Sequence, residues 1–518
     1  MSNNQPYYIT TPIYYVNGLP HIGHTYTTIV CDAMARYQRQ SGKDVYFLTG
    51  TDEHGDKIVQ AAEKEGKTAR EYVDEISGTF RKTWDSLNID YSQFIRTTDD
   101  DHKKIVGQIL QKIYDQGDIY LSEYEGRYCV GCERYLTEKE LNENGECPDH
   151  KQKPQIIKEE NYFFKLQKYL PELEKQLKEN PEFVRPKQYY NEVLGTIQEL
   201  KKTEEDLSIS RPKSRLDWGI ELPFDNRFVT YVWFDALLNY ISAIGGPDSE
   251  KFKTYWPEST HVIAKDILKP HGIFWPSMLL AAKIPNYKKL MVHGYWLGFG
   301  EAKMSKSLGN AADPIELAEK VGGIDLLRYF LLREMAFGSD SKFSEAAIES
   351  RVNIDLANGL GNLLQRTLSM IKKYFDGEIV GNLEDHACAK QINDLIHTKV
   401  NGFHENFNSF KFHMAYETVF EWVGLQNQII EENKPWAMAK ENSPELRPLL
   451  ETLLKGILTV LFYLQPVLPE RSKKIFDLLQ QKELNRFPQN ISEIQLTAMK
   501  LEEWPIYFPR LSLVEKEK

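Results

Sequence analysis

Residues 19–30, LPHIGHTYTTIV, place two histidines, His21 and His24, on either side of Gly23 at a point where the sequence pattern changes. Before this stretch, residues 7–16 (YYITTPIYYV) are β-branched and aromatic, which is typical of a strand. After it, apolar residues recur with helical spacing. The sequence therefore predicts a strand that leads into a helix, with both histidines at the junction.

The segments around this junction predict a parallel sheet. Residues 44–55 (DVYFLTGTDEHG) resemble a buried strand that runs into a polar loop, which completes a βαβ unit. A second region of this kind comes late in the chain, where strand candidates at 260–267 and 289–297 flank a helical stretch. The segment between the two regions is turn-rich, charged and cysteine-bearing. The predicted fold class is α/β, with one Rossmann-like parallel sheet split by an insertion.

Composition is that of a globular protein: 41% of the 518 residues are hydrophobic and 27% are charged. This length favours three or four domains. The net charge of −11 argues against indiscriminate nucleic-acid binding, but not against a local basic surface.

No export signal opens the chain, and the longest apolar run, residues 457–464, is too short to cross a bilayer. We therefore expect a cytoplasmic protein without membrane contact. After Pro314 the pattern predicts an α-helical bundle.

The histidine pair suits a phosphate site. In open α/β sheets, ligands bind at the carboxyl ends of strands beside helix N-termini, whose N–H groups attract anions. His21 and His24 would add donors there, and Gly23 would let an adenine ring lie against the backbone. Alternatively, both histidines are surface residues near a helix start. This short pattern fits the two interpretations equally well.

Residues 302–307, AKMSKS, form a second candidate phosphate site. Lys303 and Lys306 make a cationic loop suited to a polyphosphate, although alone it could be a solvated loop. Each motif follows a candidate sheet strand, one in each half of the split fold. The tetrapeptide HIGH and the pentapeptide KMSKS, both verbatim and in this order, resemble the hallmarks of the class I aminoacyl-tRNA synthetases.

The resemblance narrows to the methionyl-tRNA synthetases and covers nearly the whole chain. It rests on TTPIYYVNGLPHIGH, GTDEHG, FIRTTDDDH, YEGRYCVGCERYL, YVWFDALLNYISA, AKDILKPHGIFWP and ENKPWAMAK. The isoleucine, leucine and valine enzymes carry a much larger editing insertion, and the cysteine enzyme has a zinc-binding cysteine after its first strand, which is absent here. The resemblance implies two steps in translation: methionine attacks the α-phosphorus of ATP to give methionyl-adenylate, and tRNA(Met) then takes the methionyl group.

The resemblance also implies an ATP site. His21, His24 and Lys306 would be catalytic: the histidines would hold the phosphates, and Lys306 with Mg²⁺ would clamp the departing pyrophosphate. The other residues of this site would be Gly23, Asp266 and Lys303.

A methionine pocket is implied by the same resemblance. Asp52 would pair with the substrate ammonium. An apolar pocket lined with rings suits a thioether, and the residues placed there are Ile13, Tyr15, Trp233, Ala236, Tyr240 and His271. Without the resemblance, core packing would explain Trp233 and Tyr240, and a helix cap would explain Asp52.

Four residues have the spacing of a structural zinc site. Cys129-x-x-Cys132 and Cys147-x-x-His150 form two knuckles separated by fourteen residues. Because all four positions are protein ligands, we expect one structural Zn²⁺ with no open position for catalysis. The alternatives are a disulfide and reduced cysteines without metal.

The helical half carries candidate RNA contacts. Asn362 and Arg366 are four residues apart and share one helix face, and Trp436 follows a proline at a helix start. Aromatic rings with nearby amide and guanidinium groups bind single-stranded RNA bases. The resemblance implies that these three residues contact the anticodon. From the pattern alone, a solvated helix face and a core tryptophan are the commoner explanations.

With the resemblance, the domains are expected as follows: 1–117 and 229–297, the two catalytic halves; 118–228, an inserted connective domain with the zinc knuckle; 298–345, the KMSKS loop and stem-contact region; 346–518, the α-helical anticodon-binding domain. The expected ligands are L-methionine, ATP and tRNA(Met). We expect a monomer with no obligate protein partner.

Two rival functions fit parts of the sequence. A small-molecule adenylyl- or cytidylyltransferase also uses an H-x-G-H helix start, but needs neither a KMSKS loop nor a long helical appendage. A catalytically silent RNA-binding or scaffold protein would not need intact His21, His24, Asp52 and Lys306. An aminoacylation assay distinguishes the three.

Overall fold

The chain forms two compact units. The computed structural model describes residues 4–513 apart from 130–133, 137, 149–150, 204, 299–312, 382, 483 and 485. The first unit, here the sheet unit, comprises Pro6–Pro20 and Val45–His293; the second, the helical unit, comprises Met1–Gln5, His21–Asp44 and Gly294–Lys518. Across the described ranges, no helix has the length and apolar character that a membrane span requires.

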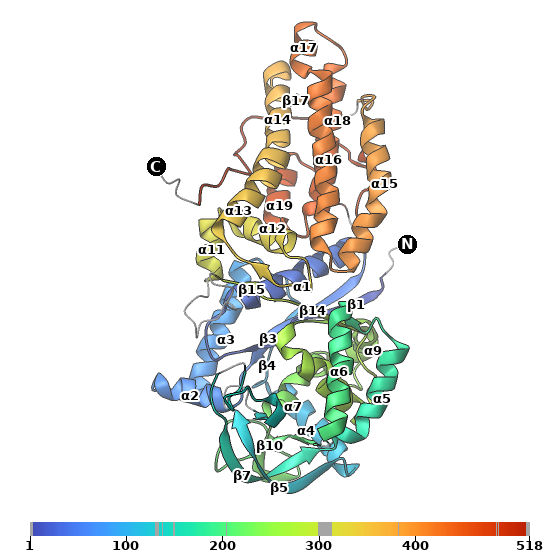
Figure 1. Ribbon diagram of the computed structural model, residues 1–518. Helices are drawn as coiled ribbons and strands as arrows, with labels where there is room; N and C mark the ends of the chain where they lie inside the picture. The colour runs from blue at the N-terminus through green and yellow to red at the C-terminus, as the bar shows by residue number, and fades with distance from the viewer. Residues whose placement is uncertain are drawn as a thin grey trace. The chain divides into compact units, whose positions relative to one another are not determined.

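The sheet unit contains a parallel sheet, of which Figure 1 labels the strands β1, β3, β4 and β14. Its strand order is β2–β3–β1–β13–β14–β8, with β4 beside β3. The pairs β2–β3, β3–β4, β1–β13, β13–β14 and β14–β8 are parallel, which confirms the predicted α/β class. The strands are β1 (Pro6–Thr10), β2 (Tyr14–Tyr15), β3 (Asp44–Asp52), β4 (Gln93–Arg96), β8 (Val184–Arg185), β13 (Ser259–Ala264) and β14 (Lys289–His293).

A proline divides the first predicted strand, residues 7–16, into two. β1 ends at Thr10 and β2 starts at Tyr14, with Pro12 between them. Proline has no N–H for the sheet ladder, so it interrupts a strand. The prediction of one continuous strand is therefore wrong, and the break creates a short segment at the carboxyl end of β1.

Helices surround the sheet within this unit. They are α2 (Asp56–Lys64), α3 (Ala69–Ser86), α4 (Asp100–Asp115), α7 (Val232–Leu237), α8 (Asn239–Ser242), α9 (Glu250–Tyr255), η2 (Trp256–Glu258), η3 (Lys265–Ile267), the π-helical η4 (Pro270–Phe274) and α10 (Trp275–Ala281). The core is continuous from strands to helices, since Leu48, Ile263 and Leu290 are buried in one cluster with Trp256 and Trp275.

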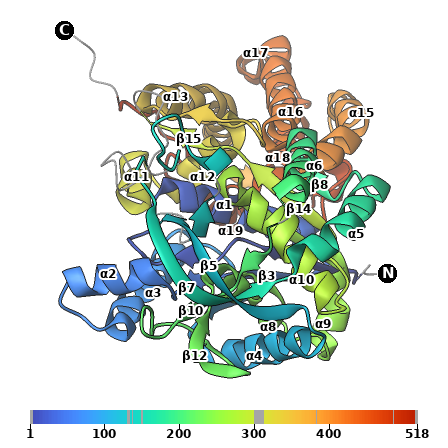
Figure 2. The same ribbon diagram turned by 60° about the horizontal axis from the view of Figure 1, so that its bottom comes forward.

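The predicted insertion is mostly antiparallel. Its sheet has the order β6–β5–β7–β9, and β5 and β7 pair from Ile119↔Phe164 to Tyr128↔Gln155 as one long ribbon (Figure 2). A smaller sheet has the order β10–β12–β11. Through β8, the same segment also supplies an edge strand of the parallel sheet. The elements are β5 (Ile119–Cys129), β6 (Arg134–Leu136), η1 (Glu138–Glu140), β7 (Gln155–Phe164), α5 (Leu166–Glu179), α6 (Lys187–Thr203), β9 (Leu207–Ser208), β10 (Ser210–Pro212), β11 (Glu221–Leu222) and β12 (Asp225–Thr230).

The helical unit contains α1 (Ile22–Gln40), the helix that begins at the two histidines. On α1, buried Asp32 pairs with Arg36 and with the fully buried Arg328 of α12 (Ile324–Glu334). The ion pair between Asp32 and Arg328 is favourable because an isolated buried charge would be costly. Farther along α1, the Tyr37 hydroxyl lies 2.8 Å from Nδ1 of His404. These contacts attach α1 to the C-terminal helices.

The C-terminal helices form the predicted bundle. In Figure 1, α14, α15, α16 and α18 run side by side. Nearly every residue of α18 is buried, including the apolar run 457–464, so this helix is the centre of the bundle. The remaining elements are α11 (Pro314–Lys320), α13 (Glu345–Arg351), the π-helical η6 (Val352–Gly361), α14 (Asn362–Phe375), β17 (Glu378–Ile379), α15 (Ala389–Asn408), α16 (Phe412–Asn433), α17 (Pro435–Lys440), α18 (Leu446–Leu464), α19 (Pro469–Leu478), η7 (Ile491–Glu493) and β18 (Met499–Lys500).

The strand predicted at 289–297 is interrupted at Gly294. β14 ends at His293, and β15 (Trp296–Leu297) pairs instead with β16 (Ser341–Lys342). A Cβ at Gly294 would lie 2.3 Å from the carbonyl oxygen of Ser339, so only glycine fits this close approach. The single predicted strand is corrected to two short ones.

Candidate functional site

Four predicted site residues lie at or just beyond the carboxyl ends of sheet strands. Tyr15 ends β2 and is the register partner of Asp52, which ends β3. Ile13 precedes β2, and Asp266 follows β13 in η3. Since these strands belong to one sheet with parallel neighbours, the structure brings all four residues to the edge where open α/β sheets bind ligands. Asp52 is 8% exposed, whereas Asp266 is exposed.

Trp233, Tyr240 and His271 form an aromatic cluster. The Trp233 and His271 rings meet edge to face at 6.2 Å, and the Tyr240 hydroxyl lies 2.8 Å from Nε2 of His271. Tyr240 and His271 are buried, and so is Ala236 on α7. Trp233 is half-buried and, like Ile13 and Tyr15, packs against the core cluster. Partly exposed rings beside buried ones are what the wall of an apolar pocket requires.

Burial keeps the His271 imidazole neutral. It lowers the pKa of His271 to about 4, although the Ile267 carbonyl and Asp266 favour the charged form. Nδ1 of the ring lies 2.8 Å from the Ile267 carbonyl oxygen, so Nδ1 donates the hydrogen bond. The Nε2 atom of this neutral tautomer then accepts from the Tyr240 hydroxyl. The cluster therefore offers an uncharged surface, which suits an apolar ligand.

A buried carboxylate that the sequence analysis missed connects three segments near this cluster. Asp235 on α7 accepts hydrogen bonds from Nδ1 of His54 at 2.6 Å and from Nε2 of His102 at 2.7 Å. Burial alone would raise the pKa of Asp235, but the two histidines, His54 first, hold it below its ordinary value. The network links α7, which carries Trp233, to the loop after Asp52.

Glu53 holds the same loop from its other side. Its fully buried carboxylate accepts from Nε and Nη2 of Arg96 at 2.7 and 2.9 Å, and from the hydroxyl of Thr51 at 2.7 Å. The indole of Trp218 donates to the Glu53 backbone carbonyl at 2.6 Å. The sequence signals for these roles were three of the stretches that carry the resemblance: GTDEHG, FIRTTDDDH and YVWFDALLNYISA. The partners themselves lie far away in sequence.

The HIGH stretch begins α1 as predicted. His21 is the N-cap residue, and its Nδ1 accepts a hydrogen bond from the Gly23 N–H at 3.1 Å. The His21 and His24 rings stack with centroids 3.7 Å apart. A Cβ at Gly23 would lie 2.9 Å from Cε1 of His21, so glycine makes room for this ring. Both rings are half-buried at a helix N-terminus, where an anion is favourable.

Four predicted residues, Lys303, Lys306, Cys132 and His150, lie outside the described residues. The other two predicted zinc ligands, Cys129 and Cys147, are buried in one small cluster with Leu136. In the part of the chain that the structure describes, no group of three or more potential metal ligands comes together.

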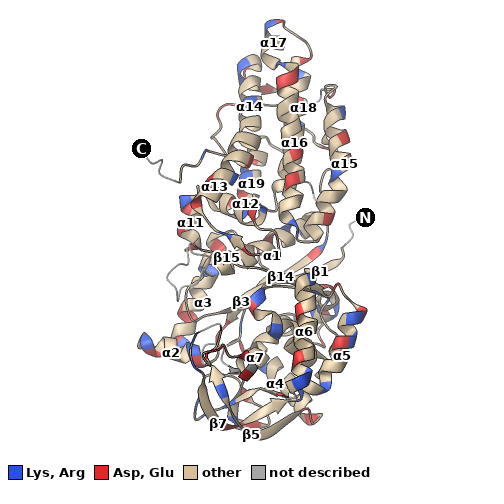
Figure 3. Ribbon diagram, viewed as in Figure 1, with Lys and Arg blue, Asp and Glu red and all other residues tan. Residues whose placement is uncertain are grey.

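The three predicted RNA contacts lie in the helical unit. Asn362 is exposed on α14, and Arg366 on the same helix pairs with Glu431 at 2.8 Å. The opposite face of α14 is buried. Trp436 is 40% exposed on α17, which begins at Pro435. Basic residues lie on α17 and at the neighbouring end of α14, among otherwise mixed charges (Figure 3).

Comparisons with known proteins match this architecture along the chain. A family model described as tRNA synthetases class I (M) matches residues 7–155 and 149–368. Methionine–tRNA ligase of Deinococcus radiodurans is 46% identical over 489 residues, which cover 92% of this chain and 70% of that protein. Methionine–tRNA ligase of Caldanaerobacter subterraneus is 42% identical over 516 residues, covering 99% and 80%. The structure of Mycobacterium tuberculosis methionyl-tRNA synthetase in complex with methionyl-adenylate is 37% identical, with a TM-score of 0.90, and covers 98% of this chain and all of that one.

Proposed function

This chain belongs to the methionine–tRNA ligase family of class I tRNA synthetases, and from this membership we propose that it attaches methionine to the 3′ end of tRNA(Met) for translation initiation and elongation. The observation that carries the proposal is the match over 92–99% of the chain to methionine–tRNA ligases at 42–46% identity.

Methionine would bind at the carboxyl edge of the parallel sheet. The edges of the Trp233 and Tyr240 rings would contact the thioether sulfur, which favours aromatic edges, and neutral His271 would leave this wall without charge. Asp52 would accept the substrate ammonium. A buried ion pair is favourable only with close geometry, and the hydrogen bonds around Glu53 and Asp235 hold the Asp52 loop on both sides. Ile13, Tyr15 and Ala236 would complete the pocket.

The first chemical step needs no protein nucleophile. A carboxylate oxygen of methionine attacks the α-phosphorus of ATP, a new P–O bond forms, and the bond to pyrophosphate breaks. We expect Mg²⁺ to arrive with the triphosphate, whose oxygens are hard ligands, and to neutralise charge there. The residues would act by alignment and by stabilising phosphate charge.

The ATP site would draw on both motifs. His21 and His24 would donate to the phosphates at the start of α1, and Gly23 would let the nucleotide approach the backbone. Lys303 and Lys306 would hold the phosphate tail and the leaving pyrophosphate, and Asp266 would bind near the ribose. A ribose hydroxyl of the terminal adenosine of tRNA would then attack the adenylate carbonyl carbon, which forms the methionyl ester and releases AMP.

The anticodon would bind to the helical unit. Exposed Trp436 offers a ring for base stacking. Asn362 and Arg366 offer donors for base edges, and Arg366 would exchange its partner Glu431 for RNA.

The cysteine cluster fits a structural zinc ion. Cys129 and Cys147 are soft thiol ligands buried together, and a backbone turn joins the Lys151 N–H to the Cys147 carbonyl at 2.8 Å. With Cys132 and His150, they would hold one Zn²⁺ tetrahedrally and stabilise the insertion. We expect about one zinc per chain by elemental analysis. A fully active preparation that contains no zinc would contradict the proposed zinc site.

We also infer the five-part domain division given above, a cytoplasmic location and a monomer without an obligate protein partner. Size-exclusion chromatography with light scattering measures the last of these.

Aminoacylation of tRNA(Met) with each of the twenty amino acids tests the proposed function, together with amino-acid-dependent exchange of pyrophosphate into ATP. We expect methionine alone to support both reactions at high rate. Nucleotidyl transfer to a small acceptor without tRNA would favour a nucleotidyltransferase. Binding of RNA with neither reaction would favour a silent RNA-binding protein.

A further inference from the structure

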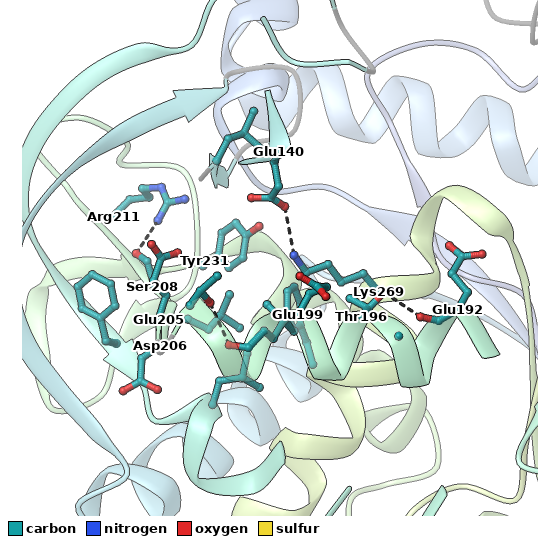
Figure 4. Close-up of a pocket in the computed structure, with 18 residues that line it drawn as sticks. Glu140, Glu192, Thr196, Glu199, Glu205, Asp206, Ser208, Arg211, Tyr231 and Lys269 are labelled. Atoms are coloured by element: carbon teal, nitrogen blue, oxygen red, sulfur yellow. Dashed lines mark hydrogen bonds and ion pairs between the residues drawn. The ribbon is translucent and has the colours of Figure 1, made fainter. Parts of the chain in front are cut away.

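A cavity in the sheet unit lies outside every role assigned above (Figure 4). Its volume is about 570 Å³, which is within the usual range of small-molecule sites. Its walls come from α6, the segment around β9, and the region of η4. Of the described residues predicted for methionine, ATP, zinc or tRNA, none lines it. The cavity is therefore a separate feature.

The cavity has apolar walls and an acidic lining. The apolar side chains among the described residues are Leu136, Phe163, Leu166, Leu200, Leu207, Tyr231 and Phe274. Among the described residues, five carboxylates line the cavity against two cationic side chains, Arg211 and Lys269. Figure 4 shows Glu192 and Glu199 on α6, with Glu140 and Lys269 facing each other nearby. By charge alone, the lining favours a cation.

Both cationic side chains already have partners. Arg211 is buried, donates to the Ser210 carbonyl at 2.6 Å and stacks over the Tyr231 ring. Nζ of Lys269 pairs with Glu140 at 3.2 Å. These partners neutralise Lys269 and hold Arg211 against the wall, so neither is well placed to receive an anionic ligand.

Glu205 is a partly buried carboxylate close to a second carboxylate, Glu140. Partial burial raises its pKa, Glu140 raises it further, and Lys269 offsets only part of this effect. By contrast, Asp206 accepts hydrogen bonds from the Gln167 N–H at 3.2 Å and the Tyr120 hydroxyl at 3.1 Å. An added positive charge between Glu140 and Glu205 would relieve their repulsion.

A glycine keeps the cavity open. Gly195 lies in the interior of α6 and lines the cavity, and a Cβ built there would meet no atom within 4 Å. Glycine inside a helix costs about 1 kcal/mol relative to alanine, and no packing constraint accounts for it here. Its effect is to leave space beside the apolar wall.

We propose that this cavity binds a small organic cation, a primary amine or ammonium with an apolar body. The body would lie beside Gly195 against the Phe163 and Tyr231 rings, and the ammonium would bind between Glu140 and Glu205. The site lies outside the proposed reaction, so binding is measured without catalysis.

Titration calorimetry of the full chain with hexylammonium tests this proposal, with hexanoate as the matched anion. We expect hexylammonium to bind and hexanoate to show no binding at the same concentration. Gly195→Leu fills the open space and should weaken binding at least tenfold, or about 1.4 kcal/mol. Gly107→Leu is the matched control, because Gly107 is also helical with nothing within 4 Å of its Cβ and lies outside the cavity.

Two further measurements separate this site from the substrate site. Glu205→Gln should weaken hexylammonium binding about fivefold, the value of one partly exposed ion pair, even if Gly195→Leu fails to fold. Saturating L-methionine should leave hexylammonium binding unchanged. Three results would each overturn the proposal: no binding of hexylammonium to the unmodified chain, displacement of hexylammonium by methionine, or the affinity of the unmodified chain in both Gly195→Leu and Glu205→Gln.

Discussion

Replacing Asp235 tests whether its two histidine hydrogen bonds hold the predicted methionine wall. An ionised carboxylate only accepts, so both His54 and His102 must donate to it. A hydrogen bond to a charged group contributes about 1.5–3 kcal/mol. Asp235→Ala removes both bonds, so we expect a loss of about 4 kcal/mol in the free energy of unfolding. Asp235→Asn has one acceptor oxygen left and should lose about half of that.

Urea unfolding followed by tryptophan fluorescence measures the change, which is taken from the shift of the midpoint at constant slope. His102→Gln is the matched control, because it removes one of the same two bonds. Combined with Asp235→Asn, it should cost less than the sum of the single variants. We also expect Asp235→Asn to raise the KM for methionine more than the KM for ATP, because α7 carries Trp233. Equal losses for the asparagine and alanine variants, or a loss below about 1 kcal/mol for alanine, would refute the two-bond explanation.

Three further predictions concern other parts of the chain. Trp436→Ala should lower charging of tRNA by up to about 100-fold, the value of one lost base stack, and Trp436→Phe should restore part of it; pyrophosphate exchange should stay normal, and equal loss in both assays would count against an RNA contact. Gly23→Ala puts a Cβ 2.9 Å from the His21 ring. Because this displaces the ring, we expect adenylate formation to be about tenfold slower, measured by pyrophosphate exchange with methionine affinity as the control. An unchanged rate would contradict the role of Gly23 in making room for the His21 ring. Burial lowers the pKa of His271 from 6.5 to about 4, so neutral His271 contributes stability above pH 6.5 that is lost as the pH falls toward 4, by about 3 kcal/mol in the free energy of unfolding. His271→Gln should reduce this pH dependence, measured by urea unfolding at several pH values. An unchanged pH dependence in the variant would rule out the role of His271.

Local features were predictable because their physics is local. The helix start at the two histidines and the helix start at Pro435 depend on residues within one or two turns. The alternation of strands and helices predicted the parallel sheet for the same reason. The strand predicted at 7–16 was wrong because its apolar pattern outweighed a proline, whose missing N–H decides the pairing.

Partners far apart in sequence could not be predicted in this way. Asp235 meets a histidine 181 positions earlier, and Arg328 meets Asp32 across 296 positions. Each segment carries a recognisable motif, such as GTDEHG, but the motif does not specify which distant residue it will contact. The requirement for glycine at position 294 was not predictable either, because it comes from the close approach of the Ser339 carbonyl.

The sequence by itself determined the family, the α/β class and the residue types at the two motifs, because short-range geometry and verbatim motifs carry that information. Only the tertiary structure decided that His271 is neutral, that Asp235 connects three segments, and that Gly195 opens a cavity. Burial and hydrogen-bond partners belong to the folded arrangement, in which residues from distant segments share one environment, and no single segment specifies that environment.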